Sequence, residues 1–187
     1  MRIISGLYKG KKILLPTDKN TRPLKDLTKE SIFNLIIHSK FSKIELEKSN
    51  VLDLFAGSGS FGLECLSRKV NFVTFVENYG SVVKILKNNI KTFKIDKNYE
   101  IIEEDIFNNN FFQNINKQFD LIFLDPPYKE ERIDFILENI IKNKIINQKG
   151  LVILHRNKKT KDHFSDKLKI VENRTYGISK IYLIKLR

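Results

Sequence analysis

The sequence has few of the residues that build disulfides and metal centres. Among its 187 residues there is a single cysteine, Cys65, so neither an internal disulfide nor a cysteine-based metal cluster can form. Its three histidines, His38, His155 and His163, are scattered and lack the close spacing of metal ligands. We therefore expect no bound metal, and we expect Cys65 to be a small residue of the core.

Long apolar runs are missing as well. No stretch reaches the roughly 18 uninterrupted apolar residues that a membrane-spanning helix needs. The first residues also lack the apolar segment of a secretory signal peptide. With 41% hydrophobic and 11% aromatic residues, the chain is nevertheless able to bury a sizeable core. These features predict one compact domain, residues 1–187, in a cytoplasmic protein that we expect to be monomeric and not bound to a membrane.

Positive charge is in clear excess. The 34 basic residues outnumber the 22 acidic ones, and the resulting formal net charge of +12 favours a polyanionic partner such as nucleic acid. Of the basic residues 27 are lysines, and isoleucine and asparagine are also frequent. An AT-rich coding sequence would produce this composition without any binding role. The charge therefore supports a nucleic-acid hypothesis but does not establish it.

From residue 50 onward, apolar segments of strand length alternate with segments of helical periodicity, joined by short connections. This alternation is typical of an α/β fold with a doubly wound parallel sheet. The predicted strands are 51–55, 72–77, 99–103, 119–125 and 151–154, followed by a closing antiparallel hairpin of 170–176 and 179–185. The predicted helices are 60–68, 83–93 and 133–143. These elements predict a seven-stranded catalytic core over residues 50–187.

Residues 1–40 are predicted to form an extension of this core. Glycines 6 and 10 separate two short apolar segments, so residues 1–16 predict a β-hairpin. A helix is predicted over residues 26–39, with Asp26 as its N-cap.

The strongest local pattern lies at Val51–Gly62, where an apolar strand containing Asp53 runs into a glycine-rich turn. A turn of this kind exposes backbone against which a cofactor can lie. Acidic residues also stand at or just beyond the ends of four successive predicted strands: Asp53, Glu77, Asp105 and Asp125. Because ligands bind at the carboxyl ends of parallel strands, we expect these four side chains to converge on one crevice.

The position of the acids favours S-adenosylmethionine (SAM) over a dinucleotide. Both cofactors use a Rossmann-like sheet, and Glu77, 20 residues after Gly57, suits the ribose hydroxyls of either. Asp53 lies where SAM brings its ammonium group, whereas it would repel the pyrophosphate of a dinucleotide. Asp105 is expected to accept a hydrogen bond from the adenine amino group. The predicted cofactor-binding residues are Asp53, Phe55, Ala56, Gly57, Gly59, Glu77, Asn78, Asp105 and Ile106.

The most specific motif is Asp125, Pro126, Pro127 and Tyr128, which directly follows a predicted strand. Its parts fit methylation of an exocyclic amine whose lone pair is delocalised into an aromatic ring. The Asp125 carboxylate and the Pro126 carbonyl would accept from the amino group and stabilise the positive charge that appears on the nitrogen. The proline rings fix that backbone, and Tyr128 would stack on a flipped-out base. We predict these four residues to be catalytic.

Basic residues gather in the first part of the chain. We predict that they contact RNA phosphates; the alternative is a solvated edge whose lysines prevent pairing with other strands. The predicted RNA-binding residues are Arg2, Lys9, Lys11, Lys12, Arg22, Lys25 and Lys29. A second basic run, residues 156–161, is predicted to be a solvated loop.

In order and spacing, these motifs resemble the RsmD family, bacterial methyltransferases that modify guanine N2 in small-subunit (16S) ribosomal RNA. The resemblance covers nearly the whole chain. It rests on Met1–Gly6 with Gly10, on Arg22 and Pro23 leading to Glu30–Asn34, on Asp53–Gly59 and on Asp125–Tyr128. It implies a Rossmann-like, SAM-dependent enzyme that flips one guanine out of an RNA loop of the assembling small subunit. The chain departs from that family at Asn78 and at His155, whose role the sequence does not explain.

Three other functions remain open at this point. An N6-adenine methyltransferase acting on DNA or RNA would use the same four-residue motif, although such DNA enzymes usually carry a separate module that reads the target. A glutamine methyltransferase is expected to have asparagine in place of Asp125. An RNA-binding assembly factor with a vestigial pocket would need none of the acids that this chain retains.

Overall fold

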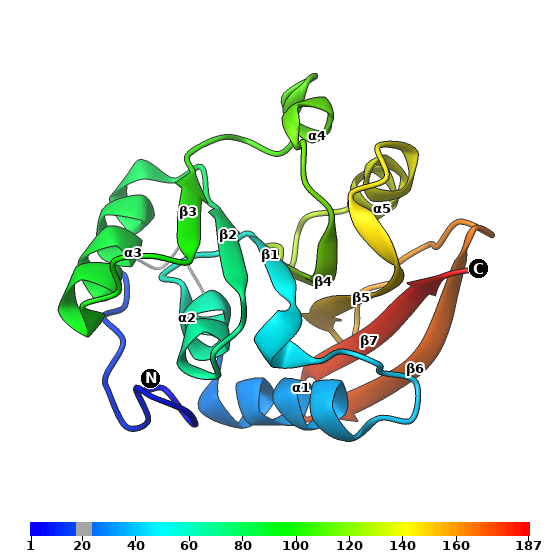
Figure 1. Cartoon of the computed structure of the whole chain (residues 1–187). Helices are drawn as coiled ribbons and strands as arrows, with labels where there is room; N and C mark the ends of the chain where they lie inside the picture. The colour runs from blue at the N-terminus through cyan, green and yellow to red at the C-terminus, as the bar shows by residue number, and fades with distance from the viewer. Residues whose placement is uncertain (18–23) are drawn as a thin grey trace.

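The apolar segments form the strands of one sheet. In the computed structural model, which describes residues 1–17 and 24–187, seven strands pair in the order β3-β2-β1-β4-β5-β7-β6 (Figure 1). The strands are β1 (Asn50–Leu54), β2 (Phe72–Val76), β3 (Tyr99–Ile102), β4 (Phe119–Leu124), β5 (Ile146–Asn157), β6 (Leu168–Tyr176) and β7 (Ser179–Leu186). The first five are mutually parallel, and β7 pairs antiparallel with β5 and with β6. The predicted doubly wound sheet with a closing hairpin is confirmed.

Helices cover both faces of the sheet. One face carries α1 (Asp26–His38), α2 (Ser60–Ser67) and α3 (Gly80–Phe93), and the other carries α4 (Phe111–Asn114) and α5 (Ile133–Lys142). A short 3-10 turn, η1 (Leu46–Lys48), precedes β1. None of the helices in the described part of the chain has both the length and the apolar character that crossing a membrane requires.

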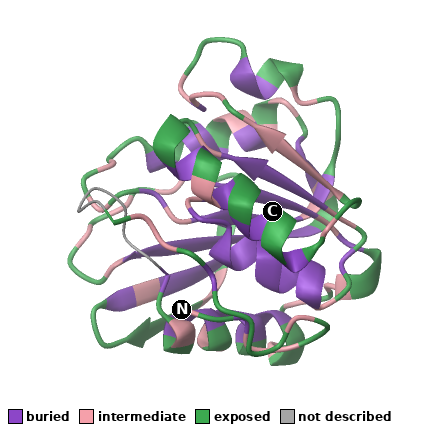
Figure 2. Ribbon diagram, turned by 90° about the vertical axis from the view of Figure 1, so that its left-hand side faces the viewer, coloured by how far each residue is buried: buried purple, intermediate pink, exposed green. Residues whose placement is uncertain are grey.

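The two hydrophobic cores follow from the alternation of side chains along the strands. On β1, Val51 belongs to the core under α1, α2 and α3, whereas Leu52 and Leu54 belong to the core under α4 and α5. Figure 2 shows the buried residues along the strands and on the inward sides of the helices. Because the central strands are covered on both faces, they are apolar almost throughout, as parallel strands require.

The N-terminal extension forms a short version of the predicted hairpin. Arg2 and Lys12 form an antiparallel bridge, and on either side of it the Ile3 N–H donates to the Lys11 carbonyl at 2.9 Å and the Ile13 N–H to the Met1 carbonyl at 3.1 Å. Its apolar side chains Ile3 and Ile13 are 0% and 4% exposed and belong to the first core. The Glu64 carboxylate of α2 accepts hydrogen bonds from the backbone N–H groups of the two residues after Ile3, at 2.7 and 3.0 Å. The extension is thus held both by its own antiparallel pairing and by its contacts with α2.

Some predicted boundaries are wrong. Asp26 is the first residue of α1 and not its N-cap, which is Lys25, and the Asp26 carboxylate accepts from the Arg2 N–H at 3.3 Å. Strand β5 begins at Ile146, five residues before the predicted start, because the polar residues that precede its apolar run continue the strand. The short elements η1 and α4 were not predicted, since three and four residues are too few to show a period.

Strand order reverses beside β1, which has β2 on one side and β4 on the other. In an open parallel sheet this reversal leaves a crevice at the carboxyl ends of the strands. The glycine-rich turn follows β1, and Asp125 follows β4. The fold therefore brings the two strongest sequence motifs to the edges of one crevice.

Candidate active site

A cavity of about 520 Å³ occupies this crevice. Its size falls within the roughly 300–1,000 Å³ typical of small-molecule sites. One side is formed by the glycine loop, by Asp53 within β1 and by the acids after β2 and β3, and the other by residues after β4 and near the end of β5. Of the predicted site residues, the lining includes Asp53, Phe55, Ala56, Gly57, Glu77, Asn78, Asp105, Ile106, Asp125, Pro126, Pro127 and Tyr128.

The glycine loop turns sharply from β1 into α2. Gly57 and Gly59 have positive φ angles of 57° and 84°, which glycine adopts most readily. A Cβ added at Gly57 would meet no described atom within 4 Å, so the backbone there faces open space. At Gly59 the added Cβ would lie 2.4 Å from Leu86 Cδ1, and Gly59 does not line the cavity. This glycine serves the turn and the close packing against α3, and its contact with a cofactor stays a prediction.

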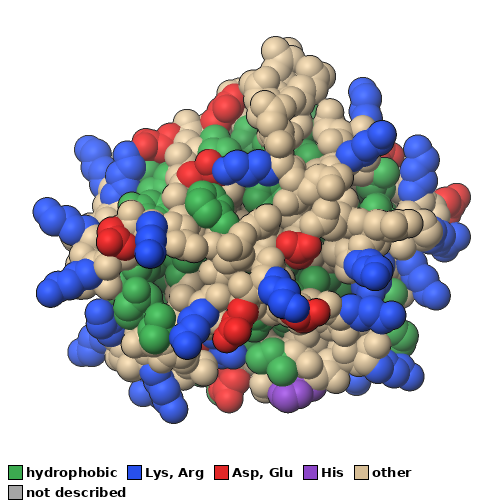
Figure 3. Space-filling model, viewed as in Figure 1, with side chains coloured by type: hydrophobic (Ala, Val, Ile, Leu, Met, Phe, Trp, Pro, Cys, Tyr) green, Lys and Arg blue, Asp and Glu red, His purple; other side chains and the backbone are tan. Residues whose placement is uncertain are grey.

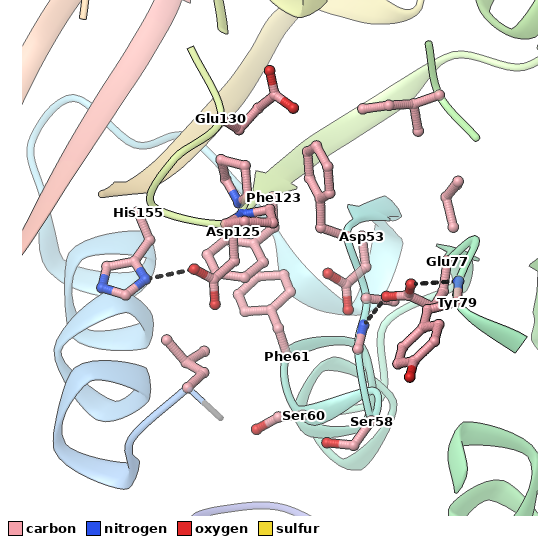
Figure 4. A pocket seen from close by; sticks show the side chains of 18 of the residues that line it. Asp53, Ser58, Ser60, Phe61, Glu77, Tyr79, Phe123, Asp125, Glu130 and His155 are labelled. Carbon is pink, nitrogen blue, oxygen red and sulfur yellow. Dashed lines mark hydrogen bonds and ion pairs between the residues drawn. The ribbon is translucent and has the colours of Figure 1, made fainter. Parts of the chain in front are cut away.

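Glu77 ties the glycine loop to the end of β2. Its carboxylate accepts hydrogen bonds from the N–H of Gly57 at 2.8 Å and of Tyr79 at 2.9 Å (Figure 4). A carboxylate has about four lone-pair sites, so these two bonds leave room for further donors. Glu77 lines the cavity, where such donors, for example a pair of hydroxyl groups, would reach it.

Asp53 places a buried carboxyl group beneath the loop. It is 1% exposed, and its carboxylate accepts a hydrogen bond from the Gly62 N–H at 3.0 Å. Burial raises the pKa of Asp53 well above its usual range, and the charges of Asp125 and Glu77 raise it further, against the opposing effect of the Gly62 N–H. A cation would relieve this penalty, so an ammonium group is the kind of ligand that the position favours.

A third part of the lining is formed by Phe107 and Arg132, which we call the aromatic wall. Asp105 accepts from the Phe107 N–H at 2.9 Å, which turns the chain after β3 into the cavity. The guanidinium carbon of Arg132 lies 3.3 Å from the centre of the Phe107 ring, and Arg132 pairs with Glu130 at 2.8 Å. A wall of this kind suits a planar aromatic group such as a purine.

The opposite side of the cavity is built around Asp125. Parallel pairing places Leu124 opposite Leu54, so Asp125 continues β4 beside the start of the glycine loop. The rings of Phe61 and Phe123 stack at 4.0 Å and line the cavity below it (Figure 4). The carboxylate thus borders an apolar slot suited to a flat, amino-bearing ring.

Two side chains at the end of β5 complete this part of the site and were not predicted. His155 Nδ1 lies 2.7 Å from Asp125 Oδ1 (Figure 4). Arg156, expected in a solvated loop, is 2% exposed and donates to the carbonyls of Pro127 and Glu130, so that expectation is wrong for this residue. The signal for His155 was present: it directly follows the predicted strand 151–154, as Asp125 ends another. Nothing in the sequence marked Arg156.

Lys29 is buried and therefore not accessible to RNA, contrary to the prediction. Its side chain is 0% exposed, its Nζ lies 3.5 Å from the Glu64 carboxylate, and it donates to the Arg2 carbonyl at 2.7 Å. Burial lowers the pKa of Lys29, and the neighbouring Glu64 opposes this shift. Lys29 therefore fastens α1 and the N-terminus to α2.

The other predicted RNA-binding residues are differently placed. Arg2, Lys9, Lys11, Lys12 and Lys25 are exposed, and of these Lys25 lines the cavity; Arg22 lies outside the described residues. Figure 3 shows lysine and arginine side chains around the periphery of this face, with acidic side chains among them, and not gathered in one patch. Their contact with RNA stays a prediction.

Comparison with known sequences gives matches over the full chain. The family described as conserved hypothetical protein 95 matches residues 1–185. The chain is 31% identical over 192 residues to the "putative rRNA methyltransferase YlbH" of Bacillus subtilis, which covers 100% of both chains. It is 36% identical over 146 residues to ribosomal RNA small subunit methyltransferase D of Haemophilus influenzae, covering 74% of this chain and 72% of that one.

A solved structure shares the whole architecture. The crystal structure of the "putative methylase HI0767" of Haemophilus influenzae superposes with a TM-score of 0.79 at 29% identity, covering 99% of this chain and 97% of that one. Because the superposition covers 99% of this chain, it includes the seven-stranded sheet, the N-terminal extension and the closing hairpin.

Proposed function

Since the chain belongs to the RsmD family of ribosomal RNA methyltransferases, we propose that it transfers a methyl group from SAM to N2 of a guanine in 16S ribosomal RNA. One observation carries the proposal: the glycine loop with its acids and the Asp125–Tyr128 segment line a single cavity. Donor and acceptor would meet there. Ribosomal RNA of the small subunit, or an assembly intermediate that contains it, is then the partner.

The residues of the first side fit SAM. Asp53 would hold the ammonium group, because a cation relieves the cost of its buried charge. Glu77 would accept from the ribose hydroxyls, and Asp105 with the aromatic wall would hold the adenine. The open space over Gly57 allows close approach to the backbone. When bound, SAM supplies an electrophilic methyl group on a sulfonium centre.

The residues of the second side would prepare the acceptor nitrogen. The guanine amino group is a weak nucleophile because its lone pair is delocalised into the ring. The Asp125 carboxylate and the Pro126 carbonyl would accept its two N–H groups, draw the nitrogen towards tetrahedral geometry and stabilise the charge that develops on it. Tyr128 would stack on the flipped-out base, an interaction of typically about 1–3 kcal/mol per base. The amine then loses one proton to Asp125.

Mass spectrometry of the RNA tests the proposal. Small-subunit RNA, naked and in partly assembled subunits, is incubated with the protein and SAM, digested to nucleosides and compared with a sample treated with the Asp125→Ala variant. We expect N2-methylguanosine only with the wild-type protein. N6-methyladenosine would instead identify an adenine methyltransferase. Absence of both, together with no SAM binding by calorimetry at millimolar concentration, would identify a non-catalytic assembly factor.

A further inference from the structure

Near its end, strand β5 carries two buried polar residues, His155 and Arg156, which are 6% and 2% exposed. Consecutive residues of a strand point to opposite faces, so the two side chains leave β5 on different sides. Both nevertheless contact the segment that follows β4: His155 contacts the Asp125 side chain, and Arg156 contacts backbone carbonyls further along. The acceptor segment is thus held from two directions by one strand end.

His155 binds one of the two oxygens of the Asp125 carboxylate and not the other. Because a carboxylate only accepts, we assign the proton of the 2.7 Å bond to His155 Nδ1, which donates it to Asp125 Oδ1. Figure 4 shows the second oxygen of Asp125 turned away from His155. One oxygen is therefore fixed by the protein, and the other is left for an amino group in the cavity.

The same bond argues against a proton relay through His155. Nδ1 already carries the proton that it donates, so it has no lone pair to take a second proton from Asp125. Nε2, on the far side of the ring, is buried and has no hydrogen-bond partner among the described residues. The chemistry of His155 is therefore that of a fixed donor, and the proton released by the amine leaves Asp125 by another route.

Arg156 fixes the backbone of the same segment. Its Nη2 donates to the Glu130 carbonyl at 2.7 Å and its Nη1 to the Pro127 carbonyl at 3.3 Å, on either side of Tyr128. Its Nε donates to Asp162 at 2.9 Å, and the side chains of this pair are 2% and 3% exposed. A guanidinium presents its donors in one rigid plane, so three simultaneous bonds leave the segment little freedom.

We propose that His155 and Arg156 are positioning residues of the methyl-transfer reaction: His155 orients the Asp125 carboxylate, and Arg156 sets the backbone that carries Tyr128. The proposal rests on the proposed function. It assigns to each residue an effect on the transfer step and none on cofactor binding, because the hydrogen bonds that the two side chains make within the described part of the chain go to Asp125, Pro127, Glu130 and Asp162 and not to the cofactor-side residues.

The role proposed for His155 is tested with two substitutions, one of which keeps the hydrogen-bond donor while the other removes it. In His155→Asn the amide nitrogen is attached to Cγ, as Nδ1 is, and keeps the donor; His155→Leu has a similar bulk and no donor. Single-turnover methyl transfer and SAM affinity are measured for both, with His163→Leu, at an exposed histidine, as the control. We expect transfer to slow by about 10–100-fold in His155→Leu and by less than about 3-fold in His155→Asn, with SAM affinity unchanged.

Two outcomes would overturn the role proposed for His155. Transfer by His155→Leu within about 3-fold of wild type would show that the orientation of Asp125 does not depend on His155. Equal losses in the two variants would show that the ring is needed for its bulk and not for its donor. The hydrogen bond between His155 and Asp125 can be tested without an activity assay, by NMR of the ¹⁵N signals of the His155 ring. We expect these signals to shift in Asp125→Ala, and unshifted signals would contradict the hydrogen bond. Failure of the wild-type protein to modify RNA would instead defeat the proposed function.

Arg156→Lys tests the role proposed for Arg156, because lysine keeps the positive charge beside Asp162 but lacks the planar guanidinium group. We expect slower transfer and a raised KM for RNA, with SAM affinity and thermal stability close to wild type. Unchanged transfer would overturn the assignment of Arg156. If Arg156→Lys fails to fold, the neutral double variant Arg156→Gln with Asp162→Asn replaces it. The rate of methyl transfer and the KM for RNA then test the role of Arg156 in the same way.

Discussion

The Asp125 carboxylate and the His155 ring meet at the ends of neighbouring parallel strands, with Asp125 Oδ1 and His155 Nδ1 2.7 Å apart. The register explains the meeting, because Leu124 of β4 pairs with Leu154 of β5, and Asp125 and His155 are the next residues of the two chains at the same edge. The carboxylate that we place at the reacting nitrogen is thus fixed before any substrate binds. Such preorganisation is the general way in which enzymes stabilise developing charge.

Asp125→Ala is expected to remove methyl transfer while leaving SAM bound. The carboxylate lies on the side of the cavity where we place the guanine. Its loss removes a hydrogen-bond acceptor for the reacting amino group in the transition state, whereas the binding of SAM in the ground state does not depend on this carboxylate. We expect a loss of at least about 100-fold in the single-turnover rate, as for removal of one stabilising group in other active sites. Calorimetry with SAM is the control. Transfer at the wild-type rate would remove Asp125 from its role.

Asp53→Asn should stabilise the protein without ligand and weaken SAM binding. Burial raises the pKa of Asp53, so ionisation of this group costs folding free energy that the neutral amide does not. A gain of about 1 kcal/mol would raise the melting temperature by about 2–4 °C in a chain of this size. Thermal melts with and without SAM would show both effects. A less stable Asp53→Asn protein would contradict the unfavourable burial of the charge.

The same shift sets a pH dependence with a definite sign. The pKa of Asp53 is raised in the folded state, so the folded protein binds the proton more tightly than the unfolded chain does. The contribution of Asp53 to stability is then fully present below the pKa that Asp53 has in the unfolded chain, about 3.9. It is lost as pH rises through the pKa that Asp53 has in the folded protein. We expect the stability difference between Asp53→Asn and wild type to increase with pH over this window. A difference that shrinks with rising pH would refute the sign.

The sequence predicted the sheet and most of the cavity because both depend on local patterns. Apolar runs identify buried strands, and the acids at strand ends, such as Asp53 and Asp125, meet because parallel strands share a carboxyl edge. It did not predict contacts that depend on how distant segments pack. Lys29 looks like a surface lysine, and its burial against Glu64 follows only from the docking of α1 on α2. Arg156 looked like part of a charged loop for the same reason.

Lys25 and Lys29, one helical turn apart, should respond in opposite ways to alanine substitution. Lys29→Ala removes a cation from beside the buried Glu64, which keeps Arg68 as a partner at 2.9 Å, and it leaves the Arg2 carbonyl without its donor. We expect a loss of about 1–3 kcal/mol of stability, as for a buried polar group that loses its partner. Lys25 is exposed at the cavity, so Lys25→Ala should leave stability unchanged and weaken RNA binding. Denaturant unfolding and RNA binding assays separate the two. A stable Lys29→Ala protein with weakened RNA binding would restore the sequence prediction for Lys29.

The exposed lysines of the N-terminal extension allow a test of the RNA contact by its salt dependence. If Lys9 and Lys12 each contact a phosphate, the double alanine variant should reduce the slope of log affinity against log salt by about 0.7–0.9 per contact. Lys142→Ala with Lys149→Ala, at exposed positions near the start of β5, is the matched control. An unchanged slope in the first variant would support the alternative of a solvated edge.

Gly57 and Gly62 flank the same turn, and alanine at each should reveal a different requirement. At Gly62 the added Cβ would lie 2.2 Å from Phe75 Cε1 in the core, so Gly62→Ala should destabilise the protein by about 1–3 kcal/mol, as overpacking does. At Gly57 the added Cβ would meet no described atom within 4 Å but would project into the space proposed for SAM, at a φ of 57° that costs alanine only about 1 kcal/mol. Gly57→Ala should therefore lose more SAM affinity than stability. Full SAM affinity in this variant would place the cofactor away from the glycine loop.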